Sequence, residues 1–195
     1  MGLHFRSETC FLCGNSRKKY NKLAGGECIC PDCAKPLETG VQFYPGRKWS
    51  KRMEAREVIA LRNLQARQNE FAARFAPDYT QGEFQADSAN GLFRAMNGTL
   101  IFPLELIQGY AECYVYSESR NDDGNTTTTY AGSCVWIALE GLPSLWCRWS
   151  PKERRKLFER EKTAQARWRE ALQPVMTYLQ GVTGRGPDGV QSVTR

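Results

Sequence analysis

The sequence is poor in histidine, and this narrows the range of enzymes to which the protein can belong. His4 is the only histidine among 195 residues. Serine and cysteine hydrolases, HExxH zinc peptidases and sites built on paired histidines all use histidine together with other groups. Such a centre would have to form around His4. The composition therefore predicts a protein without catalytic activity; a hydrolase or transferase of another design remains a third class, with no motif in its favour.

Long hydrophobic runs are missing as well. No apolar stretch approaches the roughly 20 residues that a helix needs to cross a bilayer, and residues 1–6 lack the apolar core of a secretory signal. Hydrophobic residues make up 41% of the chain and charged residues 25%, which is usual for a folded protein in water. The sequence thus predicts a cytoplasmic protein with no membrane span.

Positive charge is scarce in the middle of the chain, although the formal net charge is +6. Residues 81–150 contain three Lys or Arg against eight Asp or Glu. Residues 41–80 contain eight against four, and residues 151–195 contain ten against five. An acidic segment therefore lies between basic flanks, and it would repel a polyanion.

The cysteines are abundant but unevenly distributed. Five of the eight lie within the first 33 residues, and the others are Cys113, Cys134 and Cys147. A disulfide scaffold would spread its bridges along the chain and accompany a secretory signal. The N-terminal group therefore indicates a metal site, and the three later cysteines, which fall on predicted strands, are interpreted as buried thiols of the core.

Two Cys-x-x-Cys motifs, at Cys10 and Cys13 and at Cys30 and Cys33, are separated by 16 residues. This spacing is typical of a four-cysteine zinc site, because a two-residue spacer lets both thiolates of a tight turn bind one ion. Four thiolates complete the tetrahedral coordination of zinc and leave no position for water or substrate. About 40 residues bury too little surface to fold alone, so the metal would stabilise the module. We therefore expect one structural Zn²⁺, although four thiolates also accept iron.

Two further residues near these motifs can supply a ligand atom. Cys28 is separated from Cys30 by a single residue, which is a tighter reach than the two-residue spacer, and we interpret it as a spare thiol. His4 is an alternative outside ligand, but an exposed terminal histidine is the preferred interpretation.

The N-terminal pattern resembles a small bacterial zinc-ribbon domain family of unknown function. The resemblance covers residues 8–38, about a fifth of the chain, and rests on Cys10-x-x-Cys13-Gly14, Arg17-Lys18-Lys19, Lys22-Leu23, Gly25-Gly26 and Cys30-x-x-Cys33-Ala34-Lys35. Family members often carry a downstream β-rich domain that resembles a pleckstrin-homology-like fold. The resemblance thus implies a zinc ribbon and a fold for the rest of the chain, and it names no activity. This sequence departs from the family at Cys28 and in a long helix that follows the ribbon.

Hydrophobic periodicity predicts that helix over residues 51–76. One apolar stripe recurs at intervals of three, four and seven residues, and it consists of Val58, Leu61, Leu64, Phe71 and Phe75. The segment after it is β-rich, with a hairpin at Asn90-Gly91, strands over 109–119, 126–139 and 145–149, and a turn over 121–125.

A second helix is predicted from Ser150-Pro151-Lys152-Glu153, which combines a cap, a first-turn proline and a capping box. Pro174 is expected to kink or interrupt it, and Gly181 and Gly184 to end it. The fold class is therefore α+β. We expect a zinc ribbon over 1–40, a linker and amphipathic helix over 41–80, a β-rich domain with a C-terminal helix over 81–184, and a disordered tail over 185–195.

Two functions remain open from the sequence. The first is a non-enzymatic adaptor that binds another protein through the ribbon and the β-rich domain. The second is a nucleic-acid-binding zinc ribbon, because phosphate neutralisation requires clusters of basic residues and base stacking requires an aromatic side chain. The candidate contacts lie in the basic stretches 17–22 and 47–52, and they are Arg17, Lys18, Lys19, Lys22, Arg47, Lys48, Lys51 and Arg52.

Overall fold

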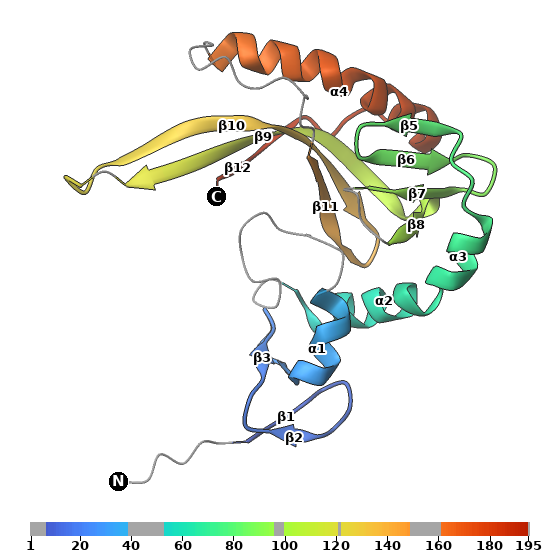
Figure 1. The fold of residues 1–195 in the computed structure, drawn as a ribbon, viewed down its shortest axis with the longest axis vertical. Helices are drawn as coiled ribbons and strands as arrows, with labels where there is room; N and C mark the ends of the chain where they lie inside the picture. Colours follow the sequence, from blue (N-terminus) through green and yellow to red (C-terminus); the bar gives the residue numbers. More distant parts are fainter. Residues whose placement is uncertain (1–6, 39–52, 96–99, 121, 149–160, 195) are drawn as a thin grey trace.

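The computed structural model describes residues 7–38, 53–95, 100–120, 122–148 and 161–194, in which helices and β-sheets are mixed (Figure 1). The cysteine-rich residues lie at one end of the molecule. Two helices lead from them to two four-stranded sheets, and the C-terminal helix lies over the sheets (Figure 1). The α+β class predicted from the sequence is confirmed.

The N-terminal segment consists of two short antiparallel strand pairs and a helix. Strand β1 (Glu8–Thr9) pairs with β2 (Ser16–Arg17), and β3 (Asn21–Lys22) pairs with β4 (Cys28–Ile29). Helix α1 (Pro31–Glu38) begins at a proline, whose missing N–H is not needed in a first turn. Leu23, Ile29 and Leu37 are buried, so this small unit has an apolar interior.

Two helices stand where the sequence predicted one over residues 51–76. They are α2 (Ala55–Ala66) and α3 (Gln68–Arg74), and residues 51 and 52 lie outside the described chain. The division at Arg67 follows from Gln68, whose Nε2 donates to the carbonyls of Leu64 and Ile101 at 3.1 and 2.9 Å. The side chain of Gln68 also accepts a bond from the Ile101 N–H at 2.7 Å. The apolar stripe itself is confirmed, because Val58, Leu61, Leu64 and Phe71 are buried.

The first large sheet is an antiparallel meander of β5 (Tyr79–Gln81), β6 (Phe84–Asp87), β7 (Leu92–Arg94) and β8 (Ile101–Pro103). The hairpin predicted at Asn90-Gly91 joins β6 to β7, and Gly91 has a φ of +64°, which suits glycine. Phe84, Phe93 and Phe102 stack in sequence across three strands, with ring centroids 5.6 and 5.4 Å apart. These rings fill one face of the sheet.

The second large sheet has the strand order β11-β10-β9-β12. A 3₁₀ turn (Leu104–Leu106) leads into β9 (Ile107–Arg120), which pairs antiparallel with β10 (Thr126–Leu139), and β11 (Leu142–Arg148) pairs antiparallel with β10. The bounds of β10 match the strand predicted over 126–139. Residues 122–124 form the bend expected between β9 and β10.

Helix α4 (Glu161–Thr183) covers both sheets and buries Leu172, Val175 and Leu179. The ring of Tyr178 stacks on Tyr79 of the first sheet at 4.2 Å. In the earlier half of the helix, Trp168 lies beside Gly132 of β10 and Arg169 bonds to Glu112 of β9. The helix continues through Pro174, so the expected interruption does not occur.

Helix α4 ends before Gly184, one of the two glycines predicted to end it, whereas Gly181 lies inside the helix. The start of the helix is not described. Gly184 has a φ of +66°, and its N–H donates to the carbonyl of Gln180 at 2.9 Å, so it closes the C-terminus. The start predicted at Ser150-Pro151-Lys152-Glu153 lies outside the described residues.

The prediction of a disordered tail over residues 185–195 was wrong. Residues Val190–Thr194 form β12, which pairs parallel with β9 at the edge of the second sheet. Tyr110 contributes two bonds that hold the preceding loop: its hydroxyl donates to the carbonyl of Arg185 at 2.7 Å, and its carbonyl accepts from the N–H of Asp188 at 2.8 Å. Strand β12 is a short edge strand held by backbone bonds. Its sequence has no hydrophobic periodicity from which a strand could be predicted.

One continuous core joins the N-terminal unit, α2 and both large sheets. A smaller cluster of Cys113, Val115 and Cys134 is buried on the second sheet, with Trp136 and Trp146 packed partly buried against it. Cys147 is buried in the main core, so all three later cysteines are core thiols as predicted. Among the residues that the structure describes, no helix has both the length and the apolarity to cross a membrane.

Candidate metal centre

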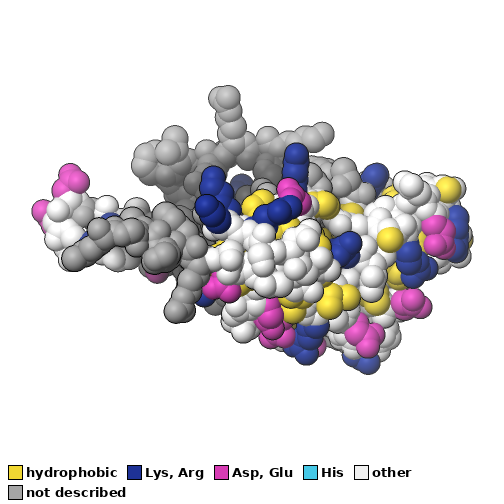
Figure 2. Space-filling view, turned by 90° about the horizontal axis from the view of Figure 1, so that it is seen from below, with side chains coloured by type: hydrophobic (Ala, Val, Ile, Leu, Met, Phe, Trp, Pro, Cys, Tyr) yellow, Lys and Arg dark blue, Asp and Glu magenta, His cyan; other side chains and the backbone are white. Residues whose placement is uncertain are grey.

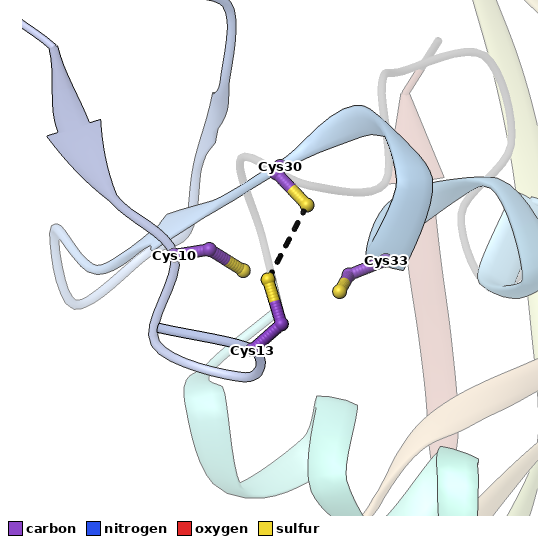
Figure 3. Close-up of side chains that lie close together, drawn as sticks. All are labelled: Cys10, Cys13, Cys30 and Cys33. Atoms are coloured by element: carbon purple, nitrogen blue, oxygen red, sulfur yellow. Dashed lines mark hydrogen bonds between the residues drawn. The ribbon is translucent and has the colours of Figure 1, made fainter. Parts of the chain in front are cut away.

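Four cysteines from two separate turns meet at one point. Cys10 follows β1 and Cys13 lies in the turn after it, whereas Cys30 follows β4 and Cys33 lies in the first turn of α1. The four Sγ atoms all lie within 4.8 Å of one another, and the side chains point toward a common centre (Figure 3). The Sγ atoms of Cys13 and Cys30 are 3.8 Å apart.

Backbone hydrogen bonds shape the first turn and attach it to the second. The N–H of Gly14 donates to the carbonyl of Cys10 at 2.8 Å, and Gly14 has a φ of +72°, which a side chain would disfavour. The N–H of Phe11 donates to the carbonyl of Cys28 at 2.9 Å. This last bond places the first Cys-x-x-Cys turn directly beside β4, from which the second one begins.

The centre is buried on one side and open on the other. Cys10 and Cys30 are each 2% exposed, Cys33 is half-buried and Cys13 is exposed. The buried pair belongs to the main core. The centre therefore lies at the surface of the N-terminal unit, with its inner half fixed by packing.

The pKa values of the Cys10 and Cys33 thiols are shifted in opposite directions. Burial alone would raise the pKa of Cys10, but the N–H groups of Cys30, Cys13 and Leu12 stabilise its thiolate and lower the pKa to about 6. Burial, together with the adjacent sulfurs of Cys30, Cys13 and Cys10, raises the pKa of Cys33 to about 12. The thiol of Cys10 thus loses its proton readily and that of Cys33 does not, so a cation at this centre would stabilise the thiolate form of Cys33.

Comparison with protein-family models, with curated proteins and with solved structures gives no match. The geometry of the four cysteines therefore carries the assignment of a metal-binding group. The resemblance to a bacterial zinc-ribbon family and to a pleckstrin-homology-like fold stays a prediction.

The two other candidate ligands lie elsewhere or outside the described chain. Cys28 lies on β4 opposite Lys22, and it does not belong to the group of four. It is buried, and burial, followed by the charge of Glu8, raises the pKa of its thiol. His4 falls outside the described residues.

The structure describes four of the eight basic residues predicted to contact nucleic acid. Arg17 on β2, Lys18 and Lys19 after it, and Lys22 on β3 are all exposed. Arg17 pairs with Asp32 of α1, with 3.5 Å between Nη2 and Oδ2. The other four, which lie outside the described residues, are Arg47, Lys48, Lys51 and Arg52.

The face of the molecule that Figure 2 shows carries both signs of charge. Seen from below, Lys and Arg side chains lie among Asp and Glu on the same face (Figure 2). A field of one sign, which long-range attraction of a polyanion requires, does not dominate the described part of this view.

Sequence reasoning missed an ion pair between β9 and α4. The Oε2 of Glu112, a buried residue, accepts a bond from Nε of Arg169 at 3.1 Å, and Nη2 of Arg169 donates to the hydroxyl of Tyr114 at 2.6 Å. These bonds fix the helix on the sheet. Alternation along β9 would place Glu112 and Tyr114 on one face, but a single sequence does not reveal which helix residue meets them.

Proposed function

We propose that Cys10, Cys13, Cys30 and Cys33 hold one structural zinc ion. Zinc binds thiolate sulfur at about 2.3 Å in a tetrahedron, which places the sulfurs about 3.8 Å apart. The Cys13 and Cys30 sulfurs have this separation, at 3.8 Å, and all four lie within 4.8 Å of one another. The clustering of these four sulfurs is the observation that carries the proposal.

The role of the ion is structural in this proposal. Four thiolates occupy every tetrahedral position, so no site remains for a water molecule or a substrate. The strand pairs of the N-terminal unit are two residues long, and such elements do not hold a fold by themselves. Metal binding supplies folding free energy to small units of this kind.

The protein acts as a non-enzymatic adaptor that binds another protein, with the zinc-folded unit as one contact surface. The proposal is supported by the saturated donor set and by the position of the centre at the surface, where Cys13 is exposed. The mixed charges on the surface (Figure 2) suit a protein partner better than a polyanion.

Affinity capture with the tagged chain tests this function. It is carried out at low and at high salt, with and without nuclease, on the wild type and on Lys18→Glu/Lys19→Glu. We expect to recover a protein that stays bound at high salt and after nuclease treatment. The charge-reversed variant should not bind this protein. Recovery of nucleic acid alone, or of nothing at all, contradicts the adaptor proposal.

Nucleic-acid binding is the second candidate, and the exposed basic residues Arg17, Lys18, Lys19 and Lys22 favour it. Each phosphate contact would contribute a slope of about −0.9 to the dependence of log K on log salt concentration. Lys19→Gln should then weaken binding and reduce this slope, whereas Arg62→Gln on the exposed side of α2 should not. Fluorescence anisotropy with a labelled oligonucleotide measures both.

A further inference from the structure

The group of four cysteines is open to water on the side of Cys13. Cys13 is exposed, whereas Cys10 and Cys30 are each 2% exposed. Zinc binds cysteine as the thiolate, and thiolate character together with access decides which cysteine an oxidant attacks first. Of the four sulfurs in the proposed zinc site, the one of Cys13 therefore meets a dissolved oxidant first.

A sulfur of the other Cys-x-x-Cys turn lies in contact with Cys13. The Sγ atoms of Cys13 and Cys30 are 3.8 Å apart and point toward each other (Figure 3). Formation of a disulfide would bring them from 3.8 Å to about 2.05 Å. Cysteines that sense oxidants combine an accessible thiolate with a second cysteine close by, and this pair has both properties.

Cys30 is a better partner for an oxidised Cys13 than Cys10 is. The Sγ atom of Cys10 accepts bonds from three backbone N–H groups. Such bonds hold the negative charge on the sulfur and make it a weaker nucleophile. A bridge between Cys13 and Cys30 would also join the two turns to each other, whereas a bridge within one turn would not.

We propose that hydrogen peroxide oxidises Cys13 and that Cys30 then closes a disulfide with it, so that the centre loses two of its four ligands and releases zinc. This switch rests on the proposed zinc site. The two cysteines come from different turns, so one oxidation event removes a ligand from each turn. The N-terminal unit would then change between a zinc-bound form and an oxidised form, and with it the surface that the proposed partner contacts.

The chemistry balances with peroxide as the only oxidant. The thiolate of Cys13 attacks one peroxide oxygen, the O–O bond breaks, and a sulfenic acid and a hydroxide ion form. The thiolate of Cys30 then attacks the Cys13 sulfur, the S–S bond forms, the S–O bond breaks, and a second hydroxide ion leaves. Two thiolates have given two electrons to the peroxide, and two protons from the solvent convert both hydroxide ions to water.

The remaining pair, Cys10 and Cys33, supplies two thiolates, and structural zinc sites use four protein ligands. The turns themselves stay together, because the N–H of Phe11 still donates to the carbonyl of Cys28 and the new bridge lies beside this bond. Reduction by a dithiol would regenerate both thiolates by disulfide exchange. The switch is therefore reversible, unlike unfolding followed by aggregation.

Treatment of the zinc-loaded full chain with hydrogen peroxide tests the proposal. A chromogenic chelator measures zinc release, and mass spectrometry of peptides from the alkylated protein locates the bridge. We expect about one zinc released per bridge formed, a bridge between Cys13 and Cys30, and renewed zinc binding after reduction by dithiothreitol. A bridge within either Cys-x-x-Cys turn, or zinc release without a bridge, overturns the proposal.

Two matched histidine variants distinguish Cys13 from the other ligands. Cys13→His and Cys33→His both leave three thiolates and an imidazole, a set that also holds structural zinc. Cys13→His should slow zinc release by peroxide at least about tenfold, because it removes the accessible sulfur. Cys33→His keeps the reacting pair and should release zinc within about twofold of the wild-type rate. Equal protection by the two variants overturns the proposal, and the peptide mapping in wild type decides it independently of how the variants fold.

Zinc analysis of the untreated chain separates this proposal from the zinc assignment. If the untreated chain contains no zinc, the assignment fails, and peptide mapping of the treated chain still decides whether Cys13 pairs with Cys30. If the chain contains zinc and peroxide neither forms the bridge nor releases the ion, the switch fails and the zinc site stands. Cys28→Ser removes a buried thiol outside the group of four, and it should leave both the bridge and the release rate unchanged.

Discussion

The side chain of Gln65 donates a hydrogen bond from Nε2 to the carbonyl oxygen of Pro36, at 2.7 Å, and so joins α2 to α1. A second bond joins the N-terminal unit to the segment before α2, and it runs from the N–H of Ala24 to the carbonyl of Met53 at 2.9 Å. Met53 and Leu37 are buried in the core that also contains the large sheets. The cysteine-bearing unit is therefore packed against the rest of the protein. A substitution in either part should change the stability of the other.

Helix α2 offers a direct measure of this coupling. Leu61 is 1% exposed, whereas Ile59 on the same helix is 47% exposed. Leu61→Ala should lower the free energy of unfolding by about 2–5 kcal/mol, because it leaves a cavity in the core. Ile59→Ala should change it by no more than about 0.5 kcal/mol. Urea unfolding followed by circular dichroism measures both, and equal losses would contradict the packing of α2 between the two parts.

The metal proposal predicts different outcomes for neighbouring cysteines. Wild type should contain about one zinc per chain by elemental mass spectrometry. Cys10→Ser and Cys30→Ser should lose it, because each removes one of four thiolates, whereas Cys28→Ser should retain it. The apparent contribution of structural zinc to small modules is about 10–16 kcal/mol, so the first two variants should unfold the N-terminal unit. Full zinc occupancy in both variants would contradict the assignment of Cys10 and Cys30 as zinc ligands.

Local patterns in the sequence predicted the parts of the structure that depend on neighbouring residues. Each Cys-x-x-Cys turn places its own two cysteines close together, Cys10 with Cys13 and Cys30 with Cys33. The apolar stripe of α2 followed from a periodicity of three to four residues. The bounds of β10 followed from a segment rich in Thr, Tyr, Val and Trp after a turn. These signals act within one element and need no knowledge of its partners.

The parts that were missed depend on contacts between distant residues. The helix divides at Arg67 because Gln68 bonds to Ile101, 33 residues away. Strand β12 pairs with the edge of β9, and its five residues, Val-Gln-Ser-Val-Thr, have no regular alternation from which a strand could be predicted. The ion pair of Glu112 with Arg169 likewise joins residues 57 apart in the chain. No window along a single sequence contains both members of such pairs.

The carboxylate of Asp87 should make the stability of the folded protein depend on pH. Its carboxylate is buried and accepts bonds from the N–H of Ala76 at 2.8 Å and from the N–H and Nδ2 of Asn90 at 3.0 and 2.9 Å. The Ala76 bond above all lowers the pKa of Asp87 below its usual value. A group with a lowered folded pKa stabilises the protein above its unfolded pKa of about 3.9, and this contribution is lost as the pH falls through the folded pKa.

Replacing the carboxylate should therefore matter at neutral pH and not in acid. Asp87→Asn should lower the urea midpoint at pH 7, and its difference from wild type should shrink as the pH falls below about 4. Glu105→Gln, at an exposed position of the 3₁₀ turn, is the control and should match wild type throughout. A difference that stays constant between pH 7 and pH 3 would contradict the role of the charge.

Two glycines separate the effect of backbone geometry from that of packing. Gly132 of β10 has a φ of +142°, and a Cβ there would lie 3.3 Å from Cζ2 of Trp168. Gly132→Ala should strain the strand and push the indole away from it, at a cost of about 1–3 kcal/mol in unfolding free energy.

Gly181 lies within α4 and has no atom within 4 Å of an added Cβ. Gly181→Ala should instead stabilise the protein by up to about 1 kcal/mol, because alanine favours a helix. Thermal and urea unfolding of the two variants, compared with wild type, measure these opposite signs. If Gly132→Ala were as stable as wild type, the contact between Trp168 and β10 would not hold α4 on the sheet, and the helix would have to be fixed by Glu112 and Arg169 alone in this region.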